Sequence, residues 1–388
     1  MRAGPAIGRC HVFGFWRAGF SLRASGAARR IPCEGVDALE AATRAWFASD
    51  VEGKDGLLVG AMPFDRAGPV VLVQPEQVEW GTGGDGALPA AAPSGIAIGG
   101  LSECPPASVY ADRVRHVLRD MAASGGALRK VVLARGLRIE AGAPVDPLAI
   151  VARLAADESV TTFLADLAAE GAGGATLVGA TPELLLSRRG RTVLSHPLAG
   201  SARRHAGEED RQAADALLRS EKDRREHALV VEAILDLLAP HCARLGTPEG
   251  TGLRSTATMW HLGTRIEGEL KSDDAPSAAG LAALLHPTPA VGGYPRDAAL
   301  EVIRGLEPKG RGYYAGALGW VDARGDGEWH VTLRCALVEG GSLMLHAGAG
   351  IVPGSDPDAE VAETAAKFRA MLQALGVDER DAVLEKVA

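Results

Sequence analysis

The chain has 388 residues, of which 47% are hydrophobic and 23% charged, and this composition predicts a globular protein with a sizeable core. Its net charge of −8 argues against non-specific nucleic-acid binding, which requires lysine and arginine to neutralise phosphates. No apolar run is long enough for a membrane-spanning helix, and the five cysteines are scattered without paired spacing. We therefore expect a cytoplasmic protein with reduced thiols that binds neither nucleic acid nor membranes.

The N-terminal 33 residues contain six arginines and no acidic residue, which is typical of a transit peptide. The segment from Phe20 to Gly26 also fits an edge strand followed by a turn, and we favour this structural interpretation. The first 20 residues are expected to be irregular. Next come a predicted helix over Val36–Ala48, strands over Gly56–Gly60 and Val70–Val73, and a surface loop or linker over residues 81–106.

Beyond residue 106 the predicted elements become denser. Helical spacing covers Tyr110–Ser124, and a β-branched strand begins at Lys130. Because strands and helices interleave without regular alternation, we expect an α+β fold with large, mainly antiparallel sheets flanked by helices. The remaining predicted strands cover residues 177–180, 192–195, 313–321, 329–338 and 343–346, and the remaining helices cover residues 209–239 and 357–375.

An acidic stripe lies on the helix predicted over Glu209–Ala239. Glu226 falls in line with apolar residues further along this helix, and Asp223 lies one turn before it. Burying such a carboxylate is costly unless it is paired, protonated or bound to a metal. Alternatively, the stripe leaves the core at Glu226 and both acids are solvated, and the spacing alone favours this interpretation.

A second acidic stripe lies on the C-terminal helix, where Glu360, Glu363 and Lys367 share one face. By default, Glu363 and Lys367 form an ordinary surface salt bridge between residues four apart. Two acidic stripes that converge on one ion would instead suit magnesium, which prefers oxygen ligands.

Single residues in loops and strands are further candidates for chemistry. Lys130 opens an otherwise apolar strand and Glu183 lies at a strand bend, so each is a routine surface charge unless it is shielded from water. A desolvated lysine can act as a general base and a shielded glutamate as a general acid. Gly200 and Gly350 leave room for backbone N–H groups to approach an anion, although tight turns explain such glycines as well.

Seven ordered blocks of sequence resemble the chorismate-utilising enzymes, the family of isochorismate, salicylate, anthranilate and aminodeoxychorismate synthases. They are KVVLAR at 130–135, GATPE at 179–183, PLAGSARR at 197–204, KDRREH at 222–227, HPTPAV at 286–291, AGAGIV at 347–352 and ETAAK at 363–367. The resemblance implies this family's fold, with a variable N-terminal part at 1–106, a chorismate-binding catalytic region at 107–376 and a C-terminal tail at 377–388.

The resemblance also implies roles for individual residues, with chorismate as substrate and Mg²⁺ as cofactor. Glu226 and Glu363 would bind the metal, supported by Asp223 and Glu360. Lys130 would deprotonate a water that attacks C2, and Glu183 would protonate the departing C4 hydroxyl. The residues implied to bind the substrate are Gly200, Ser201, His261, Ala290, Tyr314, Arg334, Gly350 and Lys367.

Two positions discriminate among members of the family. Lys130 favours water over ammonia as the nucleophile, so no glutaminase subunit is expected, and stand-alone relatives are commonly monomeric. Ala290 stands where salicylate synthases have threonine, which favours stopping at isochorismate. The resemblance therefore implies isochorismate synthase activity for a siderophore, menaquinone or secondary metabolite. Salicylate synthesis, by subsequent pyruvate elimination, is the alternative, and a non-catalytic chorismate-binding protein is a third possibility.

Overall fold

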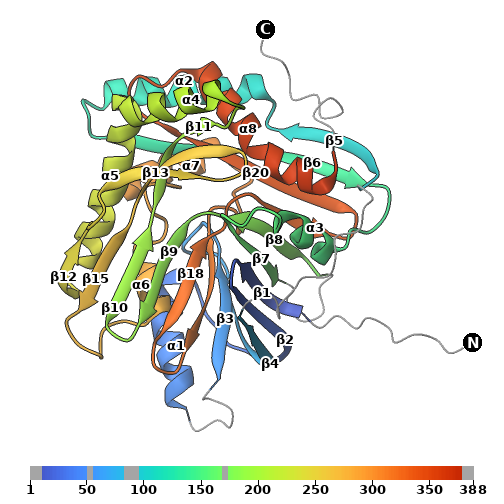
Figure 1. The fold of residues 1–388 in the computed structure, drawn as a ribbon, viewed down its shortest axis with the longest axis vertical. Coiled ribbons are helices and arrows are strands. Elements are labelled where there is room, and N and C mark those ends of the chain that lie inside the picture. Colours follow the sequence, from blue (N-terminus) through green and yellow to red (C-terminus); the bar gives the residue numbers. More distant parts are fainter. Residues whose placement is uncertain (1–10, 50–55, 83–95, 168–173, 378–388) are drawn as a thin grey trace, which may run out of the picture.

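The computed structural model describes residues 11–49, 56–82, 96–167 and 174–377 (Figure 1). These residues form the expected α+β fold, in which large antiparallel sheets are flanked by helices. Among them, no helix is long and apolar enough to cross a membrane, and the four cysteines are free thiols. Cys10 lies outside the described residues.

The large sheet contains 17 strands, and its pairings are antiparallel. The short strand β16 (Gly293–Tyr294) pairs with the first residues of β6, beyond the end of β5. Followed through its hydrogen bonds, the rest of the sheet runs β5 (Ile98–Cys104), β6 (Lys130–Ala141), β20 (Ser342–Ile351), β19 (Cys335–Glu339), β8 (Thr176–Thr181), β7 (Thr161–Asp166), β1 (His11–Arg17), β2 (Phe20–Arg30), β4 (Val71–Gly81), β3 (Leu57–Met62), β17 (Ala317–Asp322), β18 (Gly327–Val331), β9 (Leu184–Arg189), β10 (Thr192–His196), β15 (Ile266–Leu270) and β12 (Cys242–Gly246).

A second, three-stranded sheet orders as β11 (Leu198–Arg203), β14 (Met259–Thr264) and β13 (Thr251–Ser255). The chain enters it from β10 across Pro197 and leaves it into β15 across Arg265, so the two sheets share continuous strands. The helices α4 (Glu208–Arg219) and α5 (Glu221–Leu238) pack against this small sheet. The chain thereby sets α5 beside the junction of the two sheets.

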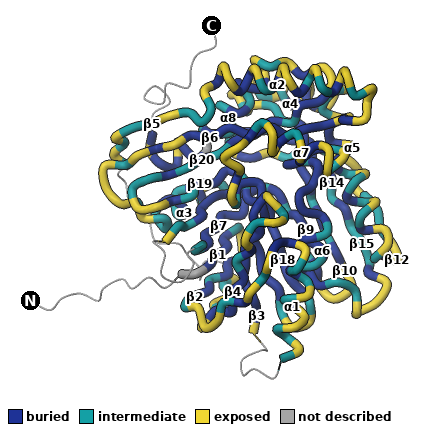
Figure 2. Tube along the Cα trace, turned by 180° about the vertical axis from the view of Figure 1, so that it is seen from behind, coloured by how far each residue is buried: buried dark blue, intermediate teal, exposed yellow. Residues whose placement is uncertain are grey.

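The other helices cover the large sheet or fill the space beside it. Figure 2 shows buried positions concentrated along the strands and exposed ones on the outer helix faces and loops. Helix α6 (Ala278–Leu285) is buried on nearly every side, which is why it is built almost entirely of alanine and leucine. The remaining helices are η1 (Val36–Ala38), α1 (Leu39–Ala48), α2 (Ala107–Ala123), α3 (Pro147–Leu154), α6 (Ala278–Leu285), α7 (Arg296–Leu306) and α8 (Pro357–Leu375).

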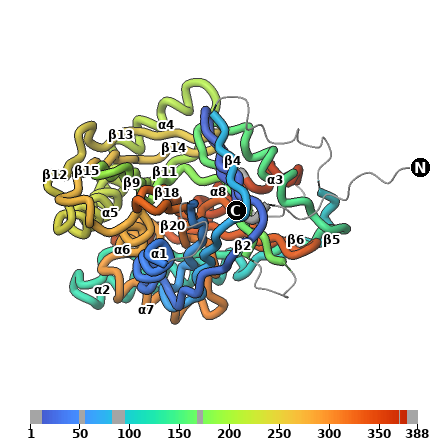
Figure 3. The backbone as a smooth tube through the Cα atoms, turned by 90° about the horizontal axis from the view of Figure 1, so that it is seen from below, coloured from blue at the N-terminus to red at the C-terminus, as the bar shows by residue number. Residues whose placement is uncertain are grey.

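The N-terminal predictions need two corrections. The strand predicted from Phe20 forms, but β2 pairs with both β1 and β4, so it is not an edge strand, and it continues through Gly26 to Arg30. Figure 3 shows β2 running alongside β4. The irregular structure expected through residue 20 is wrong for His11–Arg17, which form β1. Residues 1–10, and the tail predicted from residue 378 onward, lie outside the described residues.

Three other predicted elements differ from the observed ones in their extent. The loop predicted over residues 81–106 includes β5, which is held by its ladder to β6. The strand predicted over 329–338 is two strands, because the backbone of Arg334 turns with a φ of 46°. The strand predicted over 313–321 begins only at Ala317, since Tyr313 and Tyr314 lie in a turn.

The long helix predicted over Glu209–Ala239 is likewise two helices. Ser220 ends α4 and begins α5, and its backbone is extended with a ψ of 112°. Its hydroxyl accepts a hydrogen bond from the Asp223 N–H at 3.2 Å, which satisfies one of the free donors of the new helix. Helix α5 is therefore a separate helix from α4, and Asp223 lies in its first turn.

Candidate active site

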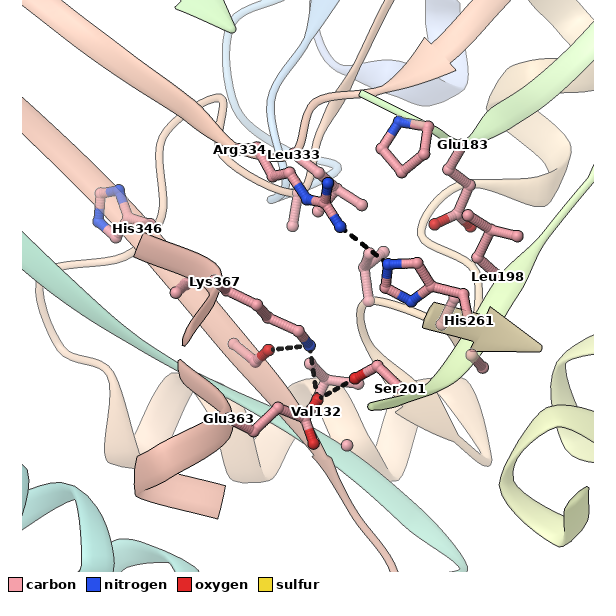
Figure 4. A pocket seen from close by; sticks show the side chains of 18 of the residues that line it. Val132, Glu183, Leu198, Ser201, His261, Leu333, Arg334, His346, Glu363 and Lys367 are labelled. Carbon is pink, nitrogen blue, oxygen red and sulfur yellow. Dashed lines mark hydrogen bonds and ion pairs between the residues drawn. The ribbon is translucent and has the colours of Figure 1, made fainter. Parts of the chain in front are cut away.

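A cavity lies between the small sheet and the β6–β20 part of the large sheet. The cavity is lined by every residue that the sequence predicts for the site except Lys130, Asp223 and Glu360, which lie just behind its walls. Figure 4 shows side chains from β11, β14, β20 and α8 pointing into it. Segments far apart in sequence thus meet at one place.

Lys130 and Glu226 form a buried ion pair. Lys130 is the first residue of β6 and is fully buried, with its Nζ 2.9 Å from Oε1 of Glu226 on α5. Gly350, which faces Val132 across the β6–β20 ladder, makes room for this contact. A Cβ at position 350 would lie 2.1 Å from Oε1 of Glu226 and 3.0 Å from Cε of Lys130. Glu226 is only 7% exposed, so the solvated interpretation of its stripe is wrong.

Glu363 on α8 is held in its ionised form. It accepts a hydrogen bond from the Ser201 hydroxyl at 2.9 Å and pairs with Lys367 Nζ at 2.7 Å. Burial favours a higher pKa for the Glu363 carboxyl, but Lys367 and Ser201 outweigh it and keep the pKa below its ordinary value. Lys367 also donates to the carbonyl of Gly348 at 2.8 Å, so the pair lies inside the cavity and is not a surface salt bridge.

Behind these residues lie the other two predicted acids. Glu360 is 1% exposed and pairs with Lys222 at 2.8 Å. Asp223 lies against Gly200, where a Cβ would come within 3.0 Å of the aspartate Cβ and where the φ of 76° also favours glycine. Burial, together with neighbouring carboxylates, raises the pKa of both Glu360 and Asp223. At the end of the cavity between α5 and α8, the negative charge of the carboxylates therefore exceeds the positive charge of the neighbouring lysines.

Glu183 behaves differently from Glu363, and it is more completely shielded from solvent. It lies between β8 and β9, and burial raises the pKa of its carboxyl from 4.5 to about 8, despite the opposing influence of Lys130 and Lys367. At neutral pH this carboxyl is therefore mostly protonated and can donate a proton.

Arg334 reaches the cavity because of the left-handed turn between β18 and β19. Its guanidinium donates to the Thr256 hydroxyl at 2.8 Å and lies 2.8 Å from Nε2 of His261 on β14. Burial lowers the pKa of Arg334 to about 10, so it stays charged at neutral pH. Burial and the adjacent Arg334 hold the pKa of His261 well below its usual range, so this ring is neutral and accepts the hydrogen bond.

Tyr314 and His346 make another part of the cavity lining aromatic. The Tyr314 ring stacks on His346 with 5.1 Å between ring centroids. Gly348 lies beside it, since a Cβ there would be 3.2 Å from the tyrosine hydroxyl. Ala290 also lines the cavity, with a methyl group.

Sequence reasoning missed several residues that build the site. Lys222 stands inside one of the quoted blocks, so its pairing with Glu360 could have been considered. Thr256 and His346 carry no sequence signal, because only the fold brings them to Arg334 and Tyr314. Arg311 also lines the cavity, and nothing in its local sequence separates it from a surface arginine.

Comparison with known proteins is consistent with this geometry. Residues 93–376 match the family model described as "Chorismate binding enzyme". The chain belongs to the chorismate-binding enzymes. Among curated members, isochorismate synthase DhbC of Bacillus subtilis (strain 168) is 45% identical over 330 residues, which cover 83% of this chain and 81% of that protein. Isochorismate synthase EntC of Escherichia coli (strain K12) is 45% identical over 250 residues, covering 64% and 62%.

Solved structures of chorismate-binding enzymes share the fold. DhbC from Bacillus anthracis superposes with a TM-score of 0.87 at 37% identity, covering 95% of this chain and 97% of that one. The menaquinone-specific isochorismate synthase MenF from Escherichia coli gives a TM-score of 0.79 at 25% identity, covering 94% and 88%. Anthranilate synthase component I from Streptococcus pneumoniae, at 19% identity and a TM-score of 0.72 over 91% and 92%, shows the common fold alone.

Proposed function

We propose that this protein is an isochorismate synthase, which converts chorismate to isochorismate. The observation that carries this assignment is a buried lysine, Lys130, close enough to a protonated glutamic acid, Glu183, to influence its pKa. Such a pair supplies a candidate base and a candidate acid for replacing one hydroxyl by another. Several curated relatives at 40–45% identity are named isochorismate synthases.

In the proposed reaction, Glu183 donates its proton to the C4 hydroxyl of chorismate, which leaves as water. A second water adds its oxygen to C2 and gives up a proton to Lys130, while the ring double bonds shift. Lys130 must be neutral for this step, so it must first lose the proton that it holds in the ion pair with Glu226. One water enters and one leaves, so substrate and product are isomers. The proton gained by Lys130 and the proton lost by Glu183 are restored by exchange before the next turnover.

The acidic end of the cavity fits a magnesium ion. Its donors are carboxylate oxygens, which Mg²⁺ prefers, and its excess of carboxylate over lysine would be relieved by a dication. Among the described residues, no three acidic, histidine or cysteine side chains cluster closely enough to hold a metal by themselves. Mg²⁺ commonly takes one or two protein carboxylates, with water and substrate oxygens as its other ligands. Glu226 and Glu363 would hold it, supported by Asp223 and Glu360, and it would neutralise the ring carboxylate of the substrate.

The substrate's other carboxylate, on its enolpyruvyl group, would lie near Arg334 and Lys367. The planar guanidinium of Arg334 suits bidentate binding of a carboxylate, and Thr256 and His261 already fix its orientation. Tyr314 would flank the enolpyruvyl group, and Gly200 and Ser201 would approach the ring carboxylate.

The products formed from chorismate test this assignment. Incubation with chorismate and Mg²⁺, followed by chromatography, should give isochorismate, and ammonium salts should add no amine product. EDTA should abolish turnover and magnesium should restore it, whereas Lys130→Ala and Glu183→Gln should each remove most of the activity. Salicylate and pyruvate as the main products would instead favour the alternative that Ala290 argues against. Turnover unchanged in both variants would refute the assigned acid and base.

The relatives also suggest where the product would go. They include a vibriobactin-specific isochorismate synthase of Vibrio cholerae and the menaquinone-specific enzyme of Escherichia coli. Isochorismate made by this protein would therefore supply a siderophore or menaquinone pathway.

A further inference from the structure

The strand that carries Lys130 has a gap along one edge. β16 pairs with Lys130 and Val131, and β5 pairs with Gly136–Ala141. Between them, the described residues provide no strand for Val132 to Arg135. Buried backbone groups in such a gap must find other partners. The Val132 N–H donates to the Gly292 carbonyl at 2.8 Å, and side chains bind the Val132 carbonyl and the Ala134 N–H.

Glu307 and Arg311 fill this gap. Arg311 Nη2 donates to the Val132 carbonyl at 2.6 Å, and Glu307 Oε1 accepts from the Ala134 N–H at 2.8 Å. The two side chains also bind each other through Nε–Oε2 and Nη2–Oε1 contacts of 2.7 Å. Together they offer β6 a donor and an acceptor at the spacing that a neighbouring strand would provide.

The same guanidinium also binds the segment of the cavity lining that contains Ala290 and Val291, which we call the Ala290–Val291 wall. Arg311 Nη1 donates to the Val291 carbonyl at 2.8 Å, and both Val291 and its neighbour Ala290 line the cavity. Four of the five N–H groups of Arg311 are used in this way. Its guanidinium lies 4.2 Å from the centroid of the Phe64 ring, and its side chain is nearly inaccessible to solvent. Most hydrogen-bond donors of Arg311 are therefore used by protein acceptors, although the residue borders the cavity.

We propose that Glu307 and Arg311 are positioning residues that fix the strand bearing Lys130 relative to the Ala290–Val291 wall. This inference rests on the proposed function, in which Lys130 must lie at a set distance from a substrate packed against that wall. A shift of about 1 Å in such a geometry can cost roughly a hundredfold in rate. Neither side chain needs to touch the substrate for this.

Arg311→Lys tests the proposal because lysine keeps the charge but loses the planar fork that reaches β6, Val291 and Glu307 together. We expect kcat to fall roughly ten- to a hundredfold, while KM for chorismate changes by less than about threefold. Hydrogen exchange measured by mass spectrometry should be faster in the peptide containing Val132 and Ala134. Should Arg311→Lys not fold, Glu307→Gln, which leaves the arginine contacts to both carbonyls in place, should show a smaller change of the same kind.

The matched control is Arg17→Lys. Arg17 pairs with the buried Glu328 and joins β1 to β18 without lining the cavity. This variant should lose stability but keep the wild-type kcat and the wild-type exchange at Val132 and Ala134. A wild-type kcat in folded Arg311→Lys, or an equal kcat loss in Arg17→Lys, would overturn the proposal. A raised KM with unchanged kcat would also overturn it, since Arg311 would then be a substrate contact. If the wild-type protein formed no isochorismate, the proposed function would fail, whereas the exchange comparison would still test the link to β6.

Discussion

Two glutamates that line one cavity have opposite protonation states, and their surroundings explain why. For Glu183, burial outweighs the lysines and raises the pKa to about 8. For Glu363, contacts with Lys367 and Ser201 outweigh burial and lower the pKa. When their environments push the pKa values of two carboxyl groups apart, the group with the raised pKa can donate a proton and the group with the lowered pKa can bind a cation.

The raised pKa of Glu183 makes stability depend on pH. The folded chain keeps a proton on this carboxyl up to about pH 8, whereas the unfolded chain loses it near the ordinary pKa of 4.5. The stabilising contribution is therefore complete below pH 4.5 and is lost as pH rises towards 8. Glutamine cannot ionise, so Glu183→Gln should become more stable than the wild type across this range, by up to a few kcal/mol near pH 8.

Urea denaturation of both proteins at several pH values measures this difference. Glu79→Gln, a substitution of an exposed glutamate, is the control and should track the wild type throughout. A stability difference between Glu183→Gln and the wild type that stayed constant from about pH 5 to 8 would mean that Glu183 is already ionised in the fold.

At the scale of elements, two interruptions place functional groups. The break at Ser220 lets α5 begin beside the cavity, which brings Asp223 against Gly200 and Glu226 to Lys130. The left-handed turn at Arg334 ends one strand and directs a guanidinium between Thr256 and His261. Uninterrupted elements would have carried these side chains past the site.

The capping bond of Ser220 gives an element-scale prediction. Ser220→Ala removes the acceptor for the Asp223 N–H and should lower the free energy of unfolding by about 1 kcal/mol. Because the first turn of α5 also carries Asp223, which is proposed to support the magnesium site, the Mg²⁺ concentration for half-maximal activity should rise. Denaturation and magnesium titration measure the two effects, and Ser220→Asn should restore both. An unchanged magnesium requirement would argue that the cap does not help place these acids.

At the scale of the whole molecule, the cavity is assembled from both sheets and from α5 and α8 of a single chain. A second copy is not needed to complete it. We therefore expect a monomer whose specific activity is constant over roughly a hundredfold dilution, because an activity that required association would fall with concentration. Size-exclusion chromatography alongside the dilution series tests this, and a specific activity that declined on dilution would contradict it.

The sequence by itself determined the fold class, the family and half of the residues that line the cavity. It could do so because the motifs lie in short contiguous blocks, and because the α+β class follows from local patterns. Helix and strand periodicity located Glu226 and Glu363, yet it could not decide whether their stripes were solvated or buried.

Only the tertiary structure decided that question, because burial and charge environment depend on segments that meet through long-range strand pairing. Glu226 is buried because β6 brings Lys130 to it and β20 brings Gly350. The protonation of Glu183 likewise depends on how completely the surrounding elements exclude water. Arg311 gave no local signal, since its role comes from reaching two backbone carbonyls that are distant in the sequence. Local patterns specify which groups are present, whereas their energetics follow from what the fold places around them.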